Sequence, residues 1–356
     1  MKRKSLIAKR KVDKKNLLIK EYKIQKFYTK FKNKLKTHIN KSDFVVAVSG
    51  GPDSLCLAYF SKLYSKEFKN KAHVLIVDHK LRNASAKEAI KVKNILKNKG
   101  IKSNILKWKG KIPNSNIQKN ARNIRYSLIS EYCDKKKLKF IITAHHIDDQ
   151  IENFFIRLLR GSGLTGLSSM SENVNYNKKI KIIRPFLDLK KSELKYVTLN
   201  FFGTFIEDPS NKNEKFLRVR IRKYRKNLEK EGLKSDNVIT SINNLMHAKK
   251  ALNFYKNKAL LKHVSFMSKN KCIINGKIFS EEAKEIIFKS FSDILSLISG
   301  SYYPPRSKKI VSLIERISKP KYNKSTLGGC VIEKKDSFIF VSKELRTKKA
   351  YIQPSK

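Results

Sequence analysis

The chain has 356 residues, 40% of them hydrophobic, so it can bury a substantial core, and its length suggests two or three domains. No apolar run approaches the roughly 18 residues of a membrane span, and the basic N-terminus lacks the apolar stretch of a secretory signal. The four cysteines are scattered without a C-x-x-C pair, which argues against a disulfide framework and against a zinc or iron–sulfur site. We therefore expect a cytoplasmic protein with no membrane partner.

The formal net charge of +52 favours a polyanionic partner, with nucleic acid as the first candidate. Lysine greatly outnumbers arginine among the basic residues, and isoleucine and asparagine are abundant. Such a composition is also typical of a chain encoded by an AT-rich genome. Charge alone therefore leaves both explanations open.

Helical and strand-like patterns alternate over the first half of the chain. Residues 1–16 read as a solvated basic tail, and apolar positions from Ile24 to Ile39 recur at helical spacing. The predicted strands are Phe44–Val48, His73–Val77, Asn104–Trp108 and Phe140–Thr143, and the predicted helices are Leu55–Tyr64, Ala84–Lys99, Gln118–Lys136 and Asp148–Leu159. This alternation predicts an α/β domain with right-handed crossovers and a mostly parallel sheet.

The second half is richer in helical patterns. The predicted elements are a strand at 181–184, helices at 192–202, 218–230, 235–265, 281–299 and 307–318, and strands at 327–333 and 337–342. We expect three regions: residues 1–40 as a basic tail and amphipathic helix, 41–225 as the α/β domain, and 226–356 as a helical and small α+β region.

Residues 49–54 read SGGPDS between a buried strand and a helix. The two glycines permit positive φ and close approach to the backbone, and the flanking Ser and Asp side chains can cap the helix. Such a junction presents N–H donors at the positive end of a helix dipole, which suits a phosphate. A tight turn without a ligand is the alternative.

A second polar motif, AHHIDDQIEN, follows the strand that ends near residue 143. On a helix that starts near His145, this residue shares one face with Asp149 and Glu152. In a parallel sheet the ends of these strands meet at one edge, beside the SGGPDS loop and Asp78. The pattern leaves three roles open: helix-start capping, metal binding and substrate binding.

The order of the motifs resembles that of a known family. SGGPDS is followed by VDHKLR at 77–82, ARNIRY at 121–126, AHHIDDQIEN with RLLRGSGLTGL at 144–167, RPF at 184–186, and EDPSN with RVRIR at 207–222. The chain resembles the tRNA(Ile)-lysidine synthetases of the PP-loop ATP pyrophosphatase superfamily, densely over residues 40–225. YYPPRSKKI and TLGGCVIEKKDSFIFVSKE extend the likeness into the C-terminal part, whereas Asn153 and the Val in RVRIR depart from the family pattern.

The resemblance implies an ATP-dependent ligation of L-lysine to C2 of the first anticodon cytidine of a tRNA(Ile) with the anticodon CAU. Cytidine O2 is first adenylated with release of pyrophosphate, and the lysine ε-amine then displaces AMP, so that the codon AUA is read as isoleucine. The implied partners are tRNA(Ile), L-lysine, ATP and Mg²⁺, and residues 226–356 would bind tRNA. The sequence leaves the oligomeric state open, a homodimer included.

The resemblance also implies roles for individual residues. ATP would be bound by Ser49, Gly50, Gly51, Pro52, Asp53, Ser54, Asp78, Arg122 and Arg125. The catalytic residues would be Asp53, His145, Asp149 and Glu152. Asp53 and Asp149 would hold Mg²⁺, and the tRNA or adenylate contacts would come from Arg160, Arg184, Arg218 and Arg306.

Three other functions compete with this hypothesis. A tRNA-thiolating PP-loop enzyme typically needs paired cysteines, and the cysteines here are isolated. A PP-loop amidotransferase would need an ammonia source, and no glutaminase region is apparent. An RNA-binding protein that kept an inactive synthetase fold is disfavoured because Ser49, Asp53, Asp149 and Glu152 are all present.

Overall fold

The computed structural model describes residues 21–80, 85–110, 117–168, 170–208, 211, 213–301 and 304–345. The chain divides into two compact units, Met1–Asn243 and Asn244–Lys356. This division falls inside helix α10 (Ser235–His263), later in the chain than residue 225, where the sequence suggests a functional boundary. Within the described ranges, no helix is long and apolar enough to cross a membrane.

The first unit is built on a six-stranded sheet with the order β3-β2-β1-β4-β6-β5. The parallel strands are β1 (Phe44–Val48), β2 (Ala72–Asp78), β3 (Ser103–Lys107), β4 (Phe140–Ile142) and β6 (Lys181–Ile183), and β5 (Asn173–Asn175) is an antiparallel edge. The predicted mostly parallel α/β fold is confirmed, although β5 was not predicted. The chain order reverses between β1 and β4, which is where open α/β sheets form their ligand crevice.

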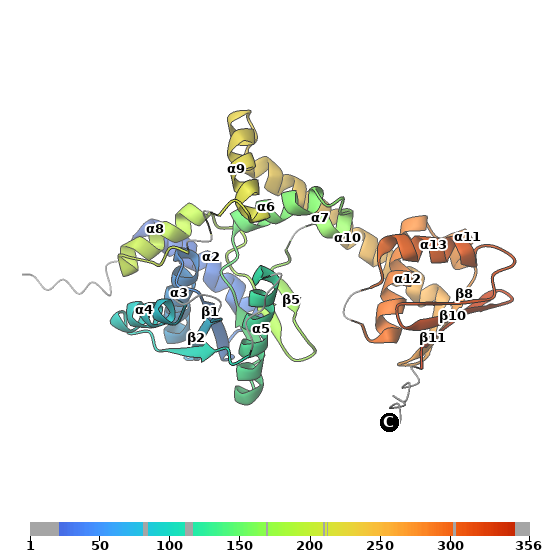
Figure 1. The fold of residues 1–356 in the computed structure, drawn as a ribbon, viewed down its shortest axis with the longest axis horizontal. Helices are drawn as coiled ribbons and strands as arrows, with labels where there is room; N and C mark the ends of the chain where they lie inside the picture. The colour runs from blue at the N-terminus through green and yellow to red at the C-terminus, as the bar shows by residue number, and fades with distance from the viewer. Residues whose placement is uncertain are drawn as a thin grey trace, which may run out of the picture. The chain divides into compact units, whose positions relative to one another are not determined.

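Strand β1 is apolar throughout because both of its faces are buried. Phe44, Val46 and Val48 belong to one core, and Val45 belongs to the other. The first core is completed by α2 (Tyr22–His38), α3 (Pro52–Phe68), α4 (Ser85–Asn98) and α8 (Lys191–Phe202), and the second by α5 (Ile117–Lys136). Helices on both faces therefore hold the carboxyl end of β1 in place (Figure 1).

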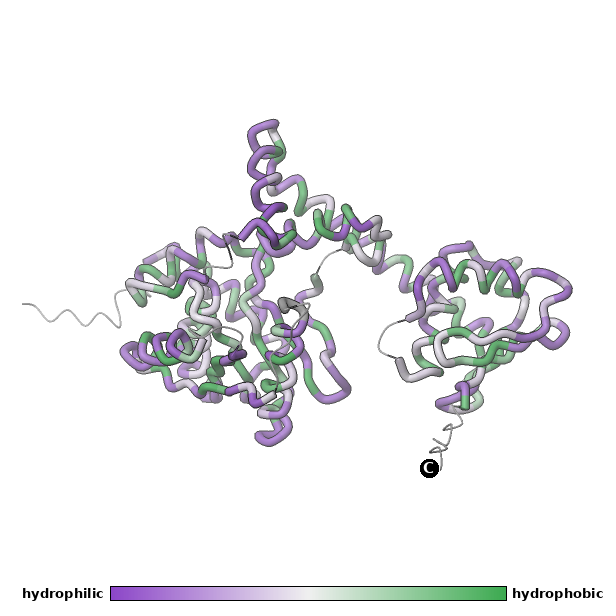
Figure 2. The backbone as a smooth tube through the Cα atoms, viewed as in Figure 1, coloured by the Kyte–Doolittle hydropathy of each residue, from purple (hydrophilic) through white to green (hydrophobic). Residues whose placement is uncertain are grey.

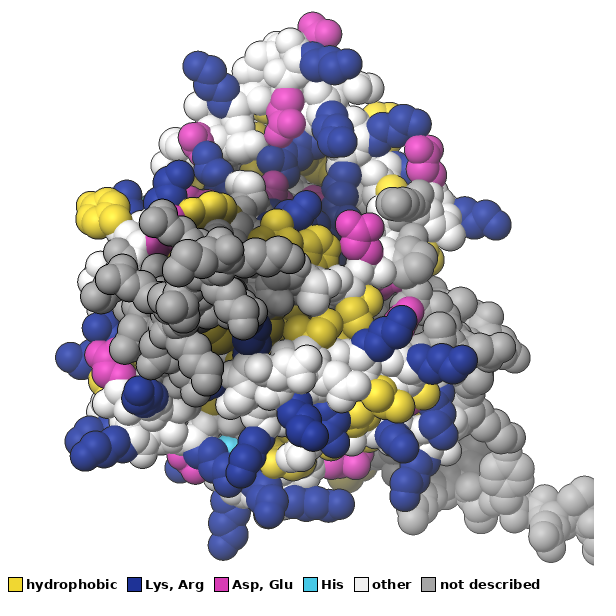
Figure 3. All heavy atoms as spheres, turned by 90° about the vertical axis from the view of Figure 1, so that its left-hand side faces the viewer, with side chains coloured by type: hydrophobic (Ala, Val, Ile, Leu, Met, Phe, Trp, Pro, Cys, Tyr) yellow, Lys and Arg dark blue, Asp and Glu magenta, His cyan; other side chains and the backbone are white. Residues whose placement is uncertain are grey.

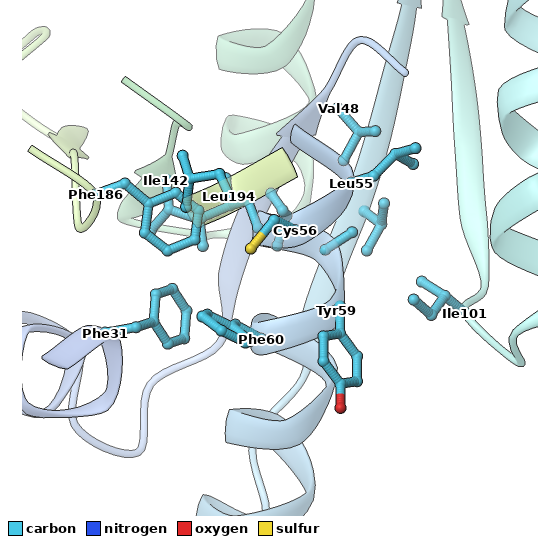
Figure 4. Close-up of a cluster of buried hydrophobic side chains, with 14 of the residues drawn as sticks. Phe31, Val48, Leu55, Cys56, Tyr59, Phe60, Ile101, Ile142, Phe186 and Leu194 are labelled. Carbon is cyan, nitrogen blue, oxygen red and sulfur yellow. The ribbon is translucent and has the colours of Figure 1, made fainter. Parts of the chain in front are cut away.

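The amphipathic helix expected before the sheet is α2, which packs on the first core as predicted. Its Phe31 ring lies 5.6 Å from the rings of both Phe60 on α3 and Phe186 after β6, measured between centroids. Figure 4 shows these three side chains converging beside Cys56. The core thus joins segments that are far apart in the sequence.

Helix α6 (Ile147–Leu158) begins one residue before the predicted start at Asp148 but two residues after His145, with His146 as its N-cap. His146 has an extended backbone and forms an isolated parallel bridge with Phe186. The expectation that His145 lies on this helix is therefore wrong, because sheet pairing continues through the second histidine. His145 lies at the end of β4 instead. After α6 ends, the chain forms the short helix α7 (Leu164–Leu167).

The second unit contains a five-stranded antiparallel sheet with the order β7-β8-β11-β10-β9. Its strands are β7 (Val264–Ser268), β8 (Lys271–Asn275), β9 (Lys324–Leu327), β10 (Cys330–Lys335) and β11 (Phe338–Lys343), and its helices are α11 (Ile278–Glu281), α12 (Lys284–Ser299) and α13 (Ser307–Ile317). The strand predicted at 327–333 is confirmed as β10 from Cys330 onward, but not before it, because Gly328 and Gly329 have positive φ and turn β9 back onto β10. Strands β7 and β8 were not predicted.

Candidate active site

Residues 49–51 connect β1 to α3, so the predicted strand–turn–helix junction is confirmed. Gly50 has a φ of +91°, and a Cβ atom there would meet Val92 Cγ2 at 2.4 Å. The Ser54 hydroxyl accepts hydrogen bonds from the backbone N–H groups of Ser49 (3.2 Å) and Gly50 (3.1 Å). The loop is thereby held tightly against the N-terminus of α3, where the helix dipole favours an anion.

Two carboxylates from different elements meet at the buried imidazole of His146. Asp53 Oδ2, in the first turn of α3, and Asp149 Oδ2, on α6, each lie 3.5 Å from His146 Nε2. Asp53 Oδ1 is buried and has no hydrogen-bond partner among the described residues. Two acidic groups with a buried oxygen to spare form a donor set that suits Mg²⁺, which favours carboxylate and phosphate oxygens.

His146 lies at the centre of this acidic cluster, although the sequence had not singled it out as a site residue. Burial lowers the pKa of His146, but its contact with Asp53 and the charges of Asp149, Asp53 and Asp148 outweigh burial, so the pKa is raised. The sequence places His146 beside His145 in the same motif, but it does not indicate which of the two histidines faces the loop.

His145 has the opposite electrostatic environment. Its Nδ1 atom lies 2.8 Å from Thr143 Oγ1, and burial, together with the charges of Arg184, Arg122 and Arg218, lowers the pKa to about 3 despite the carboxylate of Asp149. The imidazole is therefore uncharged at neutral pH. Three of the arginines predicted to contact ATP or tRNA thus act on the charge of this side chain.

Glu152 is buried and paired with arginines of α9 (Leu217–Lys230). Arg222 binds it with both arms of the guanidinium, Nε to Oε1 at 2.5 Å and Nη2 to Oε2 at 3.3 Å. Arg218 Nε lies 3.5 Å from Oε2, and Arg225 Nη1 donates to Asp148 Oδ1 at 2.7 Å. Neither Arg222 nor Arg225 was predicted as a site residue. Their spacing from Arg218, by four and seven residues, could have indicated that all three lie on one face of a helix.

Other predicted residues lie in different environments. Asp78 is buried at the end of β2, where its Oδ1 accepts hydrogen bonds from the Lys80 N–H (3.0 Å) and the Ser85 hydroxyl (2.7 Å), so it holds its own turn. Arg125 is partly buried, and burial lowers its pKa. Arg160 is exposed beyond the far end of α6, a helix of 12 residues and therefore about 18 Å long.

Arg306 is the exposed N-cap residue of α13 in the second unit. Arg306 is therefore in the second unit, whereas all the other predicted site residues are in the first unit.

The mostly parallel sheet and the loop at residues 49–54 are those of a PP-loop protein, and the PP-loop domain family matches residues 19–227. The chain is 33% identical to the tRNA(Ile)-lysidine synthase of Orientia tsutsugamushi (strain Boryong), over 84% of this chain and 69% of that protein. It is also 33% identical to the enzymes of that name from Rickettsia bellii (strain OSU 85-389), over 90% and 75% of the two chains, and Wolbachia pipientis wMel, over 86% and 73%. The chain belongs to the tRNA(Ile)-lysidine synthase family, as the motifs indicated.

A solved structure supports the fold. The U34-tRNA thiolase from Methanococcus maripaludis, which carries a [4Fe-4S] cluster, superimposes with a TM-score of 0.52 at 19% identity, over 63% of this chain and 79% of that one. In the protein described here all four cysteines are buried and free of disulfides. Cys56 and Cys133 lie in separate cores of the first unit, and Cys272 and Cys330 in the second unit.

Proposed function

We propose that this protein joins L-lysine to C2 of the first anticodon cytidine of a tRNA(Ile) with the anticodon CAU, using ATP. The observation that carries the proposal is the meeting of Asp53, from the phosphate loop, with Asp149, from α6, at His146. Membership of the tRNA(Ile)-lysidine synthase family supports the substrates.

The first step converts cytidine O2, a poor leaving group, into a good one by adenylation. Cytidine O2 attacks the α-phosphate of ATP, an O–P bond forms, and the bond to the β-phosphate oxygen breaks with release of pyrophosphate. Negative charge develops on the departing phosphates, which the N-terminus of α3 and nearby arginines such as Arg122 and Arg218 can stabilise. Preorganised donors of this kind need no rearrangement as the charge develops.

The second step transfers lysine. The ε-amine attacks C2, a C–N bond forms, the C2–O2 bond breaks with AMP as the leaving group, and the nitrogen loses a proton. Burial raises the pKa of Asp149, but the charges of His146 and Arg218 and the hydrogen bond from the His146 N–H outweigh burial and lower it, so this carboxylate stays ionised. The uncharged His145 beside it can accept a hydrogen bond from the amine.

Mg²⁺ fits the pair formed by Asp53 and Asp149, because Asp53 Oδ1 is buried without a partner among the described residues. These two side chains would hold the ion together with phosphate oxygens and water. When bound, the ion supplies charge neutralisation at the phosphates.

A direct experiment tests the proposal. The full-length protein is incubated with ATP, Mg²⁺, labelled L-lysine and a tRNA(Ile) transcript with the anticodon CAU. We expect label in the tRNA, with stoichiometric AMP and pyrophosphate, and none with a transcript whose first anticodon base is uridine. Equal labelling of both transcripts, or no labelling of either, would contradict the proposal.

A further inference from the structure

The arginines of α9 form a row against the acidic start of α6. Arg218, Arg222 and Arg225 are spaced by four and three residues, which places them on one face of the helix. Arg222 and Arg218 reach Glu152, and Arg225 reaches Asp148. Figure 2 shows that α9 is mostly hydrophilic, but its apolar residues also meet α6: Ile221 is buried, and it lines a pocket together with Phe155 and Leu158. The arginine row is therefore one of two attachments of α9 to α6.

Charge at Glu152 is already balanced by the protein itself. Its side chain is only 3% exposed, and both carboxylate oxygens accept from Arg222, with Arg218 also nearby. Two guanidinium groups already lie against this one carboxylate. A lysine ammonium would have to displace a charge-assisted bidentate pair, which is among the strongest hydrogen-bonded pairs in proteins.

Arg222 lies one helical turn from the acidic cluster at the phosphate loop. Its partner Glu152 is three residues after Asp149 on α6, and Asp149 meets Asp53 of the loop at His146. The charges of Asp149 and Asp53 act with Glu152 to raise the pKa of Arg222 despite its burial. A triphosphate in the loop would add a second anionic partner on the same side as Asp53. Guanidinium groups bind phosphate bidentately, as they bind carboxylate, so a phosphate can replace Glu152 as the partner of Arg222.

We propose that Arg222 is a displaceable counter-ion for Glu152. It neutralises Glu152 while the loop is empty, turns to the phosphates when ATP binds, and so frees Glu152 to receive the ammonium group of lysine. Arg225 keeps α9 attached to α6 through Asp148 during the exchange. The inference rests on the proposed function and adds an order to it, with nucleotide binding before lysine.

This arrangement avoids two unfavourable states. A buried carboxylate without a partner is costly, and Arg222 removes that cost in the empty enzyme. An empty site that attracted cations would also bind lysine before ATP is present. Because coupling between two ligands is reciprocal, lysine should raise nucleotide affinity by the same factor as nucleotide raises lysine affinity.

The test measures binding of labelled L-lysine to the full-length protein by equilibrium dialysis, without tRNA. The nucleotide is α,β-methylene-ATP with Mg²⁺, which cannot be cleaved between the α and β phosphates. For the wild type we expect lysine affinity to rise at least about tenfold when the nucleotide is added. For Arg222→Gln we expect lysine binding without nucleotide to lie within about threefold of its value with nucleotide.

Arg220→Gln is the matched control, because it removes the same charge from the same helix. Its guanidinium donates to the backbone carbonyls of Glu214 and Lys215 rather than to Glu152. We expect this variant to keep the nucleotide dependence of the wild type. Arg222→Lys keeps a charge but loses the bidentate geometry, so its lysine affinity should depend less on nucleotide than that of the wild type. This variant provides the test if Arg222→Gln does not fold.

Two results would overturn the inference: equal lysine affinity of the wild type with and without nucleotide, or an undiminished nucleotide dependence in the folded Arg222 variants. Neither result touches the proposed function, which is read from lysine transfer to tRNA by the wild type. If that transfer fails, the proposed function is wrong. If transfer occurs and the Arg222 variants keep the dependence, only the counter-ion role is wrong.

Discussion

At the scale of single residues, the two glycines of the phosphate loop have different constraints. Gly50 has a φ of +91° and no room for a Cβ beside Val92, whereas Gly51 has a φ of −71° and only Ser49 Oγ at 4.0 Å. We predict that Gly50→Ala lowers the free energy of unfolding by about 1–3 kcal/mol. Gly51→Ala should change it by less than about 0.5 kcal/mol.

Urea unfolding followed by circular dichroism measures both substitutions. Similar losses of stability for the two variants would show that the backbone conformation and close packing at Gly50 do not matter. A phosphate loop that tolerated Gly50→Ala would also weaken the assignment of the loop as a tight anion cradle.

We predict that Asp53→Asn lowers turnover about a hundredfold or more with little change in stability. The carboxylate lies at the carboxyl edge of the sheet, and its contact there is with His146, to which an asparagine amide can still donate or accept a hydrogen bond. Pyrophosphate release measures turnover, and thermal unfolding measures stability. Asp43→Asn is the control, because Asp43 is exposed and caps the Lys71 N–H. Near-normal turnover of Asp53→Asn would refute the ATP-site assignment.

We predict that Glu152→Gln loses most lysine transfer but keeps a measurable part of pyrophosphate release. A carboxamide can hold neither the lysine cation nor its proton, whereas adenylation needs ATP, Mg²⁺ and cytidine. Quenched single-turnover reactions that resolve adenylated tRNA from lysidine-containing tRNA separate the two steps. Equal loss of both would assign Glu152 to the organisation of the whole site and remove its lysine-specific role.

At the scale of elements, one carboxylate joins three helices. Asp148, at the start of α6, accepts from the Lys191 N–H at the start of α8 (3.0 Å) and from Arg225 of α9 (2.7 Å). Burial raises the pKa of Asp148, but these two hydrogen bonds outweigh burial and lower it. The stabilisation is therefore complete above the unfolded pKa of about 3.9 and is lost as the pH falls through the lower folded value.

We predict that Asp148→Asn costs about 1–2 kcal/mol of unfolding free energy at pH 7. The difference from the wild type should shrink as the pH falls from about 4 towards 2. Urea unfolding at a series of pH values checks both parts. Asp188→Asn, which removes a more exposed ion pair with Lys34, should cost less than about 1 kcal/mol. A constant difference across the pH range would mean that the charge of Asp148 contributes nothing.

At the scale of the whole molecule, the predicted tRNA-binding role of the C-terminal region can be tested by truncation. The cut belongs after residue 250 rather than after 225, because Val238 and Ile242 on α10 pack against Ile151 of α6. We predict that residues 1–250 bind the ATP analogue normally but lose most affinity for tRNA. The fall of affinity with salt should also become shallower, because fewer phosphate contacts remain.

Filter binding of tRNA at several salt concentrations measures this effect, and nucleotide binding confirms that the truncated chain is folded. Tight tRNA binding by residues 1–250 at the salt slope of the full chain would disprove the division. Figure 3 shows basic side chains scattered over the visible face, with acidic ones between them. Local contacts are therefore a better guide than the net charge to which lysines serve tRNA.

The sequence by itself determined most of the first unit, because its signals are local. Buried parallel strands are continuous apolar runs, so β1 was predicted at its observed limits, and the glycines and helix-capping residues of 49–54 predicted the strand–turn–helix junction. The second unit was predicted less well. The predicted helix at 235–265 overlaps the start of β7, whose side chains are mostly exposed and lack a buried alternating pattern, and Gly328 and Gly329 act as a turn only because β9 and β10 pair.

Only the tertiary structure decided which charges neutralise one another. Glu152 and Arg222 are 70 positions apart, and nothing in the spacing of either motif indicates that α9 lies along α6. His146 gathers Asp53 and Asp149 because sheet pairing with Phe186 delays the start of α6 by two residues relative to His145. Long-range pairing of side chains depends on how elements pack, and a periodic pattern reports only which face of an element is buried.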